Sequence, residues 1–435
     1  MNQYNEVQTR FLTDDERLIL SNEKEMPLVI EAKEQKSLSF LIQWLANNAE
    51  AVIHDMAQYG AVLLRGFEIQ SDEDFEKVIL SIPSFRGISD AFMAENGRVP
   101  VDKLKYVLHT NAVYKTGGTL YLGGFHTENY YSPDVPGYIC FYCKAPSALG
   151  GETGLINTEK VYRALSEPLK KKLEKQSYFV SKWLVSEVAQ RYNISKDKVE
   201  KIAQFFKLPI VGEGEDRFIL MYKPSVFKHP LTHEKALQIN LFELPKLNAA
   251  LRKCFLNAYT GKTWFWHRFF WRLPNSVFNF IEFTAVMVIA FCHSPRNSFS
   301  IIKNKIATYW ANKKVHSFNT QKLGTSFSQA EVEALAQTMR EQYSSCLWKK
   351  GDVLLIDNKK VMHAGMPGKG DRVIRAMIGN PIAMDYFSNE IGCIDAHEQS
   401  LETIGYYMNL GKIPASKVQS NVLRHSEQTC AQGNI

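Results

Sequence analysis

The apolar residues of this chain follow two spacings, and these predict helices and buried strands. Between residues 38 and 57 apolar side chains recur every three or four positions, as on one face of an amphipathic helix. Residues 60–67 form a continuous apolar run between glycines, which is typical of a strand buried on both faces. Ser71 precedes three acidic residues, so we expect it to cap the start of the next helix.

Both spacings continue along most of the chain and define the expected fold class. Further helical spacing lies at 159–176, 195–206, 245–258, 276–290 and 329–343. Strand-like apolar runs lie at 138–143, 217–222, 351–358 and 372–378. Short buried strands surrounded by helices predict a mainly β fold, with a double-stranded β-helix (jelly-roll) core in a helical jacket and a largely helical insertion.

Changes in this pattern divide the chain into five expected parts. The polar start, residues 1–35, is expected to be an N-terminal extension, and 36–184 the first part of the jelly-roll domain. Residues 185–345 are expected to form a mixed, largely helical insertion or lid. Residues 346–390 should supply the final barrel strands, and the polar residues 391–435 a C-terminal tail.

Composition excludes several classes of protein. The 435 residues are 45% hydrophobic and 22% charged, which is ordinary for a globular protein. The net charge is +7 without a dense basic run, so nucleic acid is not an expected partner. The seven cysteines are scattered, and only Cys140 and Cys143 have CxxC spacing. The absence of a second CxxC pair argues against a zinc site. The scattered cysteines and the polar N-terminus favour a reducing, cytoplasmic location over secretion.

Two stretches of the chain are strongly apolar or aromatic, and the first must be weighed as a transmembrane span. Residues 277–292 are strongly apolar, but they contain Asn279 and Glu282 and are too short for a transmembrane span. We expect a buried or lid helix there and no transmembrane span. Residues 262–270 (KTWFWHRFF) are aromatic and basic. The favoured interpretation is the apolar face of a jacket helix; the alternatives are a substrate lid or a docking face for a carrier protein or a greasy substrate. Peripheral membrane contact of the protein is a separate alternative.

The most informative residues are His126 and Glu128, which follow the apolar run 119–122. Residues i and i+2 of a strand point to the same face, so both side chains can enter one cavity. They would supply two of the three ligands of a 2-His-1-carboxylate facial triad, which binds non-haem Fe(II) and leaves positions open. An isolated His-x-Glu is most often a solvated turn, so this prediction depends on a third ligand elsewhere.

His363 is the best candidate for that third ligand. It follows the strand expected at 351–358, and it lies 363 − 126 = 237 residues after His126. No local motif accounts for such a separation, whereas a barrel that brings its first and last strands together would.

Arginine and threonine residues suggest a second ligand beside the metal. Arg372 begins the next expected strand, and a guanidinium is the two-pronged donor that the far carboxylate of 2-oxoglutarate requires. Arg375 is the alternative, and strand alternation places the two arginines on opposite faces. Thr153 is our choice for a hydroxyl beside the same carboxylate.

With these residues in place, the chain resembles the taurine dioxygenase-like (TauD/TfdA) family of Fe(II)- and 2-oxoglutarate-dependent oxygenases. It is most similar to the branch of amino-acid hydroxylases and clavaminate synthase-like enzymes. The matching blocks are GAVLLRGF (60–67) with Phe75, FHTENY (125–130), PGYICFYCKAPSALGGET (136–153), KPSVFKHPLTHEKALQIN (223–240), WKKGDVLLIDN (348–358) and residues 363–378.

The resemblance implies the jelly-roll fold and assigns residues to roles. By position, His126, Glu128 and His363 fall on iron, and Thr153 and Arg372 fall on 2-oxoglutarate. Retention of the carboxylate ligand favours hydroxylation or a related C–H oxidation over halogenation. The spacer 366–371 is shorter than in many relatives, which keeps Arg375 open as the alternative arginine.

The expected function is therefore oxidation, in the simplest case hydroxylation, of a C–H bond with Fe(II), 2-oxoglutarate and O2. The substrate class is a small amino-acid-like or secondary-metabolite molecule, either free or tethered to a carrier protein. The expected substrate contacts, chosen by proximity to the motifs, are Asn129, Tyr131, Asn240 and Arg375. Two alternatives share the metal site: a zinc hydrolase, and a non-catalytic scaffold.

Overall fold

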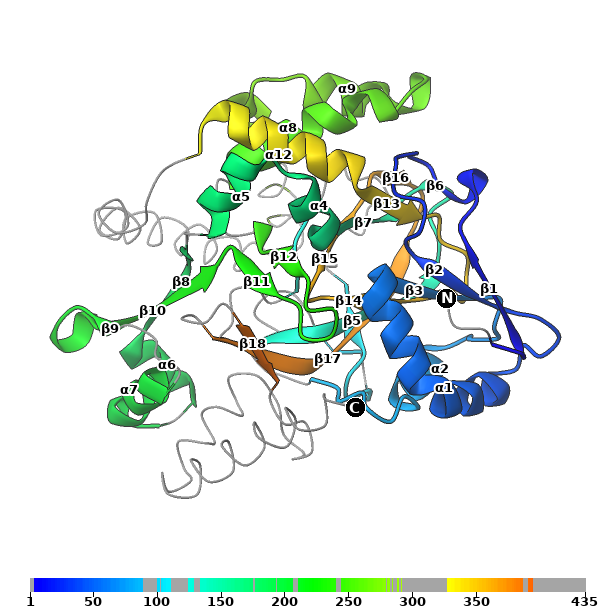
Figure 1. Ribbon diagram of the computed structural model, residues 1–435, viewed down its shortest axis with the longest axis horizontal. Coiled ribbons are helices and arrows are strands. Elements are labelled where there is room, and N and C mark those ends of the chain that lie inside the picture. The colour runs from blue at the N-terminus through cyan, green and yellow to red at the C-terminus, as the bar shows by residue number, and fades with distance from the viewer. Residues whose placement is uncertain are drawn as a thin grey trace.

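The computed structural model describes most of the chain (Figure 1). The described residues are 4–88, 100–110, 124–128, 134–239, 244–291 and 327–393, with short gaps at 102, 175–176, 193, 206–209 and 386–389 and at several positions between 279 and 290. In Figure 1 the strands occupy the centre, with α1 and α2 on one side and α8 and α12 on the other.

A main sheet of ten strands, counted over the described residues, forms the larger layer. Its central strands pair antiparallel, whereas β2 and β3 pair in parallel. In order across the sheet, the strands are β1 (Val7–Phe11), β2 (Leu28–Ala32), β3 (Ala61–Arg65), β14 (Val353–Asp357), β5 (Asp134–Ala145), β17 (Val373–Asp385), β18 (Glu390–Cys393), β11 (Val226–Lys228) and β12 (Lys235–Leu237), with β4 (Leu108–His109) paired to β17.

A smaller sheet faces the main one and closes the jelly roll. Its order is β13 (Tyr343–Cys346), β7 (Thr153–Asn157) and β15 (Val361–Gly365). Side chains from both sheets meet in one core cluster, for example Leu354 from β14, Leu155 from β7 and Val361 from β15. The expected jelly-roll core is confirmed.

Strand alternation assigns each side chain of the main sheet to one of two cores. On β14, Leu354 and Ile356 belong to the core between the sheets, while Val353 and Leu355 belong to the core under the first helices. Because successive side chains of a strand point to opposite faces, one continuous apolar run serves both layers.

Helices cover the outer faces of both sheets. The first pair, α1 (Leu38–Tyr59) and α2 (Asp72–Leu80), packs on the main sheet. Ser71 caps α2 as expected, because its hydroxyl accepts the Asp74 N–H. The outer face of the small sheet is covered by α4 (Thr158–Ala164), α5 (Glu167–Glu174), α8 (Leu244–Phe255), α9 (Phe265–Trp271) and α12 (Gln329–Glu341).

The remaining described elements are short. A second three-stranded sheet, β8 (Ser177–Leu184), β10 (Phe218–Pro224) and β9 (Ile210–Val211), carries its own small core with α6 (Val185–Tyr192) and α7 (Lys196–Phe205). The pair β6 (Leu149–Gly150) and β16 (Gly368–Lys369) lies at one end of the barrel. The 3-10 turns are η1 (Asp14–Glu16), η3 (Gly214–Asp216), η5 (Leu256–Ala258) and η6 (Lys262–Trp264).

The structure differs from the expected elements in three places. Residues 1–35 are not a separate extension, because β1 and β2 add two strands to the edge of the main sheet. The helix expected at 159–176 is two helices, since Pro168 lacks an N–H and its ring excludes a continuous helix at residue 164. In the segment 277–292, expected to be a buried or lid helix, the described residues do not form a fully buried helix: Phe278 is buried, but Val277, Phe280, Val288 and Phe291 are exposed. The lid alternative stays a prediction.

Among the helices of the described residues, none is long and apolar enough to cross a bilayer. The tail expected at 391–435 contributes the end of β18 up to Cys393, and its remainder lies outside the described residues.

A buried charged cluster ties the N-terminal segment to β14. The Arg65 guanidinium at the end of β3 donates to both carboxylate oxygens of Asp352, at 3.0 and 2.6 Å. Its third nitrogen donates to Glu16 at 2.7 Å. Arg65 and Asp352 are almost completely buried, so neither charge has water as a substitute partner.

We predict that Arg65→Met destabilises the protein by about 3–5 kcal/mol, because it leaves the Asp352 carboxylate buried without its cation. Urea unfolding followed by circular dichroism measures the change. Arg163→Met is the matched control: this arginine pairs with Glu234 on the surface at 3.5 Å, and we expect a loss below about 1 kcal/mol. Equal losses in the two variants would contradict the prediction.

Candidate metal centre

The backbones of His126 and His363 are hydrogen-bonded to each other as an antiparallel pair. The His126 N–H donates to the His363 carbonyl at 3.1 Å, and the His363 N–H donates to the His126 carbonyl at 2.9 Å. Residues that exchange both hydrogen bonds are exact opposites in an antiparallel pair, and their side chains share one face. The two imidazole rings consequently lie with centroids 4.5 Å apart.

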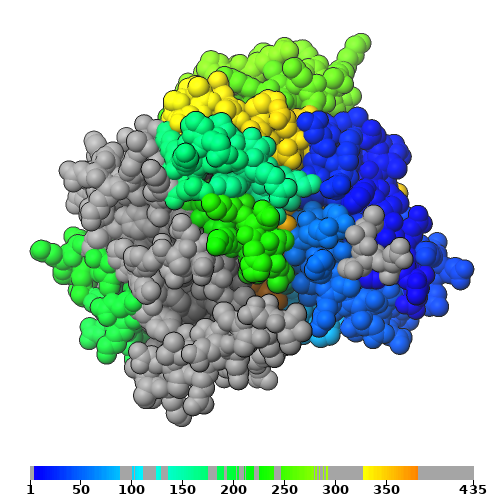
Figure 2. Space-filling view, viewed as in Figure 1, coloured from blue at the N-terminus to red at the C-terminus, as the bar shows by residue number. Residues whose placement is uncertain are grey.

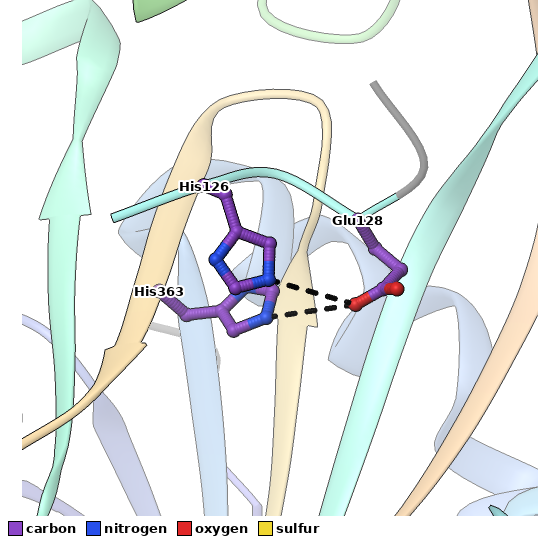
Figure 3. Close-up of side chains that lie close together, drawn as sticks. All are labelled: His126, Glu128 and His363. Carbon is purple, nitrogen blue, oxygen red and sulfur yellow. Dashed lines mark ion pairs between the residues drawn. The ribbon is translucent and has the colours of Figure 1, made fainter. Parts of the chain in front are cut away.

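Glu128 joins the histidines from the same segment as His126. Its carboxylate oxygen Oε2 lies 4.0 Å from His126 Nε2 and 3.8 Å from His363 Nε2. Figure 3 shows both rings directed at this carboxylate. Glu128 and His363 are buried, whereas His126 is partly exposed, so the cluster opens to solvent on the His126 side.

This donor set fits a single divalent metal ion. One carboxylate oxygen and two imidazole nitrogens lie within 4.8 Å of one another. Two ligands that bind one ion at about 2.0–2.2 Å each are separated by at most about 4.4 Å, and both measured carboxylate–imidazole distances fall inside this limit. Two imidazoles and one carboxylate are the ligands of the facial triad that binds non-haem Fe(II).

A backbone contact orients the His126 ring for metal binding. His126 Nδ1 lies 2.9 Å from the Gly124 carbonyl. A carbonyl only accepts, so Nδ1 carries the proton and donates. Nε2, the nitrogen nearest Glu128, is then the one with a lone pair for a metal.

Asn358 holds Glu128 in place, and sequence reasoning did not identify it. The side-chain Oδ1 of Asn358 accepts the Glu128 N–H at 2.7 Å. Its Nδ2 donates to the carbonyls of Glu128 at 3.2 Å and Pro136 at 2.7 Å. This completely buried amide therefore fixes the backbone of the carboxylate ligand.

The turn that carries Asn358 is itself held by buried charges. Asp357 Oδ2 lies 2.9 Å from His229 Nε2, and Oδ1 lies 3.1 Å from Lys359 Nζ. Lys360 pairs with Glu159 at 2.8 Å. Burial alone would raise the pKa of Asp357, but the facing charge of Lys359 and the hydrogen bond from His229 outweigh it and hold that pKa well below its usual range.

Arg372 and Thr153 lie on the inner side of the barrel, along β15 from His363. Thr153 is buried and pairs in register with Gly365, two residues beyond His363. A Cβ on Gly365 would lie 3.9 Å from Arg372 Nη1. This Nη1 donates to the Gly151 carbonyl at 2.7 Å, and among the described residues Arg372 forms no ion pair with a carboxylate.

A buried acid lies on the other side of Thr153. Glu152 is fully buried, and burial raises its pKa to about 7. The Tyr343 hydroxyl donates to it at 3.4 Å. A carboxyl with a pKa of about 7 is only partly ionised at neutral pH, so it neutralises Arg372 only in part and the guanidinium keeps a capacity to bind an anion.

Of the remaining sequence candidates, Arg375 is described, and it does not reach the site. Arg375 points to the opposite face, as alternation required, and its Nε donates to Asp72 at 3.1 Å beneath α2. Asn129, Tyr131 and Asn240 lie outside the described residues.

Comparison with known proteins now adds the family. The model of the family described as taurine catabolism dioxygenase TauD, TfdA family matches residues 24–253, which is more than half of the chain. The chain therefore belongs to the TauD/TfdA family. The matched range includes His126, Glu128 and Thr153 but ends before His363 and Arg372, which join the site through geometry.

Individual relatives are more distant. The dapdiamide synthesis protein DdaC of Enterobacter agglomerans is 25% identical over 114 residues, which cover 26% of this chain and 32% of DdaC. The match thus spans about a third of that relative's length.

Two solved structures resemble the fold at 13% identity. One is PvcB, an Fe, alpha-ketoglutarate dependent oxygenase from an isonitrile synthetic pathway, found in Pseudomonas aeruginosa (TM-score 0.45, 87% of this chain and 95% of that one). The other is a taurine dioxygenase from Burkholderia xenovorans (TM-score 0.44, 93% and 99%).

We predict that Asn358→Ala weakens metal binding by about 10–100-fold, because the Glu128 backbone loses the amide that fixes it. Anaerobic calorimetric titration with Fe(II) measures the affinity. Asn257→Ala, at an exposed position, is the control and should bind as the wild type does. Unchanged affinity in a folded Asn358→Ala protein would show that the amide does not position the ligand.

A second prediction concerns acid stability. The pKa of Asp357 is lowered by folding, so its stabilisation is present above the pKa of an unfolded aspartate, about 3.9, and is lost as the pH falls below it. Asp357→Asn should cost about 3–5 kcal/mol near pH 7. In urea unfolding at a series of pH values, the difference in unfolding free energy from wild type should narrow below about pH 4; a constant difference would contradict the prediction.

Proposed function

We propose that this protein is an Fe(II)- and 2-oxoglutarate-dependent dioxygenase that hydroxylates a C–H bond of a small amino-acid-like or secondary-metabolite substrate, free or tethered to a carrier protein. The observation that carries the proposal is the convergence of His126, Glu128 and His363 beside an arginine without a carboxylate partner in the described residues. Membership of the TauD/TfdA family supports it.

Metal binding requires one particular protonation state of the three ligand side chains. Both imidazoles are neutral at Nε2 and Glu128 is ionised, so metal affinity falls at acid pH. The Gly124 carbonyl keeps the His126 proton on Nδ1. When bound, the iron lets O2 and 2-oxoglutarate oxidise a C–H bond, with succinate and carbon dioxide as co-products.

The proposed 2-oxoglutarate site runs along β15. Strand residues rise about 3.4 Å each, so Gly365 lies about 7 Å from His363. This is the length scale of a five-carbon dicarboxylate that chelates the metal at one end. Arg372, beside Gly365, would bind the distal carboxylate with charge-assisted hydrogen bonds, and the Thr153 hydroxyl would add a donor.

The substrate class is inferred from a relative, and the location is inferred from the cysteines. The name of DdaC, a dapdiamide synthesis protein, favours a substrate from a biosynthetic pathway. The described cysteines, Cys140, Cys143, Cys254 and Cys346, are free thiols, which favours a reducing compartment such as the cytoplasm.

We predict that the purified protein with anaerobically added Fe(II) forms succinate from 2-oxoglutarate, slowly without substrate, and that His126→Ala abolishes this activity. Arg372→Leu should raise the KM for 2-oxoglutarate at least about 100-fold, as expected for losing roughly 3 kcal/mol of charged hydrogen bonding. Arg375→Leu is the matched control, and its KM should stay within about threefold, because Asp72 holds that arginine outside the barrel.

Both alternatives to the oxygenase predict no turnover of 2-oxoglutarate in this experiment, and the metal content of the purified protein and a hydrolase assay separate them. A zinc hydrolase would bind metal through the same ligands but would neither turn over 2-oxoglutarate nor respond to Arg372→Leu. A non-catalytic scaffold would bind metal without turnover. Turnover with equal effects of Arg372→Leu and Arg375→Leu would retain the oxygenase and reject the assignment of Arg372.

A further inference from the structure

Helix α9 carries aromatic side chains on both of its faces. On the inner face, Trp264, just before the helix, and Trp271 are buried in the core over the small sheet. On the outer face, Phe265, Trp266 and Phe269 are 53%, 59% and 47% exposed. Packing in the core explains why the inner residues are aromatic. It does not explain the aromatic residues on the outer face, which are not buried by this chain.

The outer residues belong to a larger apolar surface. Of the eleven large apolar side chains that are exposed in the described residues, seven lie between 265 and 291. We name Phe265, Trp266, Phe269, Val277 and Phe280 the aromatic ridge. The three rings on α9 contact one another, with centroids 5.3 Å apart for Phe265–Trp266 and 5.9 Å for Trp266–Phe269. A concentrated apolar surface of this kind marks an interaction site.

The described chain around the ridge is basic. Residues 244–278 contain six Lys and Arg residues and no acidic residue, for a net +6. This stretch includes α8, α9 and the start of the next helical segment, so the aromatic side chains lie on a locally basic part of the chain.

Exposed cations flank the ridge itself. Lys262 lies just before α9 and Arg272 just after it, and Lys253 is exposed at the end of α8. Within the described part of the chain, none of the three forms an ion pair with a carboxylate. Their charges remain available to an anionic partner next to the aromatic side chains.

We infer that the aromatic ridge docks this protein on the surface of an anionic lipid bilayer. Phe and Trp insert at the boundary between headgroups and acyl chains, and flanking Lys and Arg bind anionic headgroups. Figure 2 shows the part of the chain that contains α8 and α9, in light green, as a convex rim at the top of the molecule. A convex shape suits insertion in a fluid lipid surface better than docking into the groove of an acidic protein. The protein lies on the bilayer, since no described helix crosses one.

The test is flotation of the full-length protein with vesicles. One set is phosphatidylcholine alone, and the other contains roughly one third phosphatidylserine. We expect binding to the second set only, weakened by added salt. Trp266→Ser with Phe269→Ser should lower the partition coefficient at least about tenfold, and Lys262→Glu with Arg272→Glu should remove the preference for phosphatidylserine.

The matched control replaces exposed apolar residues away from the ridge. Leu80 and Leu231 are 41% and 52% exposed, and Leu80→Ser with Leu231→Ser should bind vesicles as the wild type does. Circular dichroism establishes that each variant is folded. Vesicle binding is measured without iron or 2-oxoglutarate, so its result is independent of the proposed enzymatic function.

Three outcomes would overturn the inference. The first is no binding of wild type to phosphatidylserine vesicles. The second is equal binding by the ridge variant and the wild type. The third is a wild-type dimer in sedimentation velocity that the ridge variant abolishes, together with no vesicle binding, which would make a second copy of the chain the occupant of the ridge.

Discussion

The site depends on the charged turn between β14 and β15. Asp357, fully buried, is held between His229 and Lys359, and Lys360 is held by Glu159. Because β14 belongs to the main sheet and β15 to the small one, this turn fixes how the two sheets face each other. It also presents Asn358 to Glu128 and leads directly to His363, so two of the three proposed metal ligands take their positions from it.

Buried charges hold both ends of β14. Arg65 and Asp352 form the cluster at its start, and Asp357 forms the one at its end. Apolar side chains of similar volume would stabilise such positions equally well or better. What charges add is selectivity, because a slipped register would leave an ion buried without its partner, whereas an apolar contact tolerates the slip. A metal site built across two sheets requires that register.

Those parts of the candidate site that depend on the alternation of side chains along a strand could be predicted from the sequence. His126 and Glu128 two positions apart, and Arg372 and Arg375 on opposite faces, follow from strand geometry alone. The roles of Asn358 and Asp72 could not be predicted, because their partners are 230 and 303 residues away. Likewise, an acidic residue at a strand end suggests a turn, and only the fold shows that Asp357 is buried against His229.

One helix connects the surface of this protein to its interior. The outer face of α9 forms the aromatic ridge, while Trp264 at its base lies 3.1 Å from the position of a Cβ on Gly150. The next residue, Gly151, accepts the hydrogen bond from Arg372. Side chains this tightly packed move together, because protein interiors have little free volume. A displacement of α9 at a surface would therefore reach the loop beside the arginine, which makes the position of the ridge relevant to the chemistry inside the barrel.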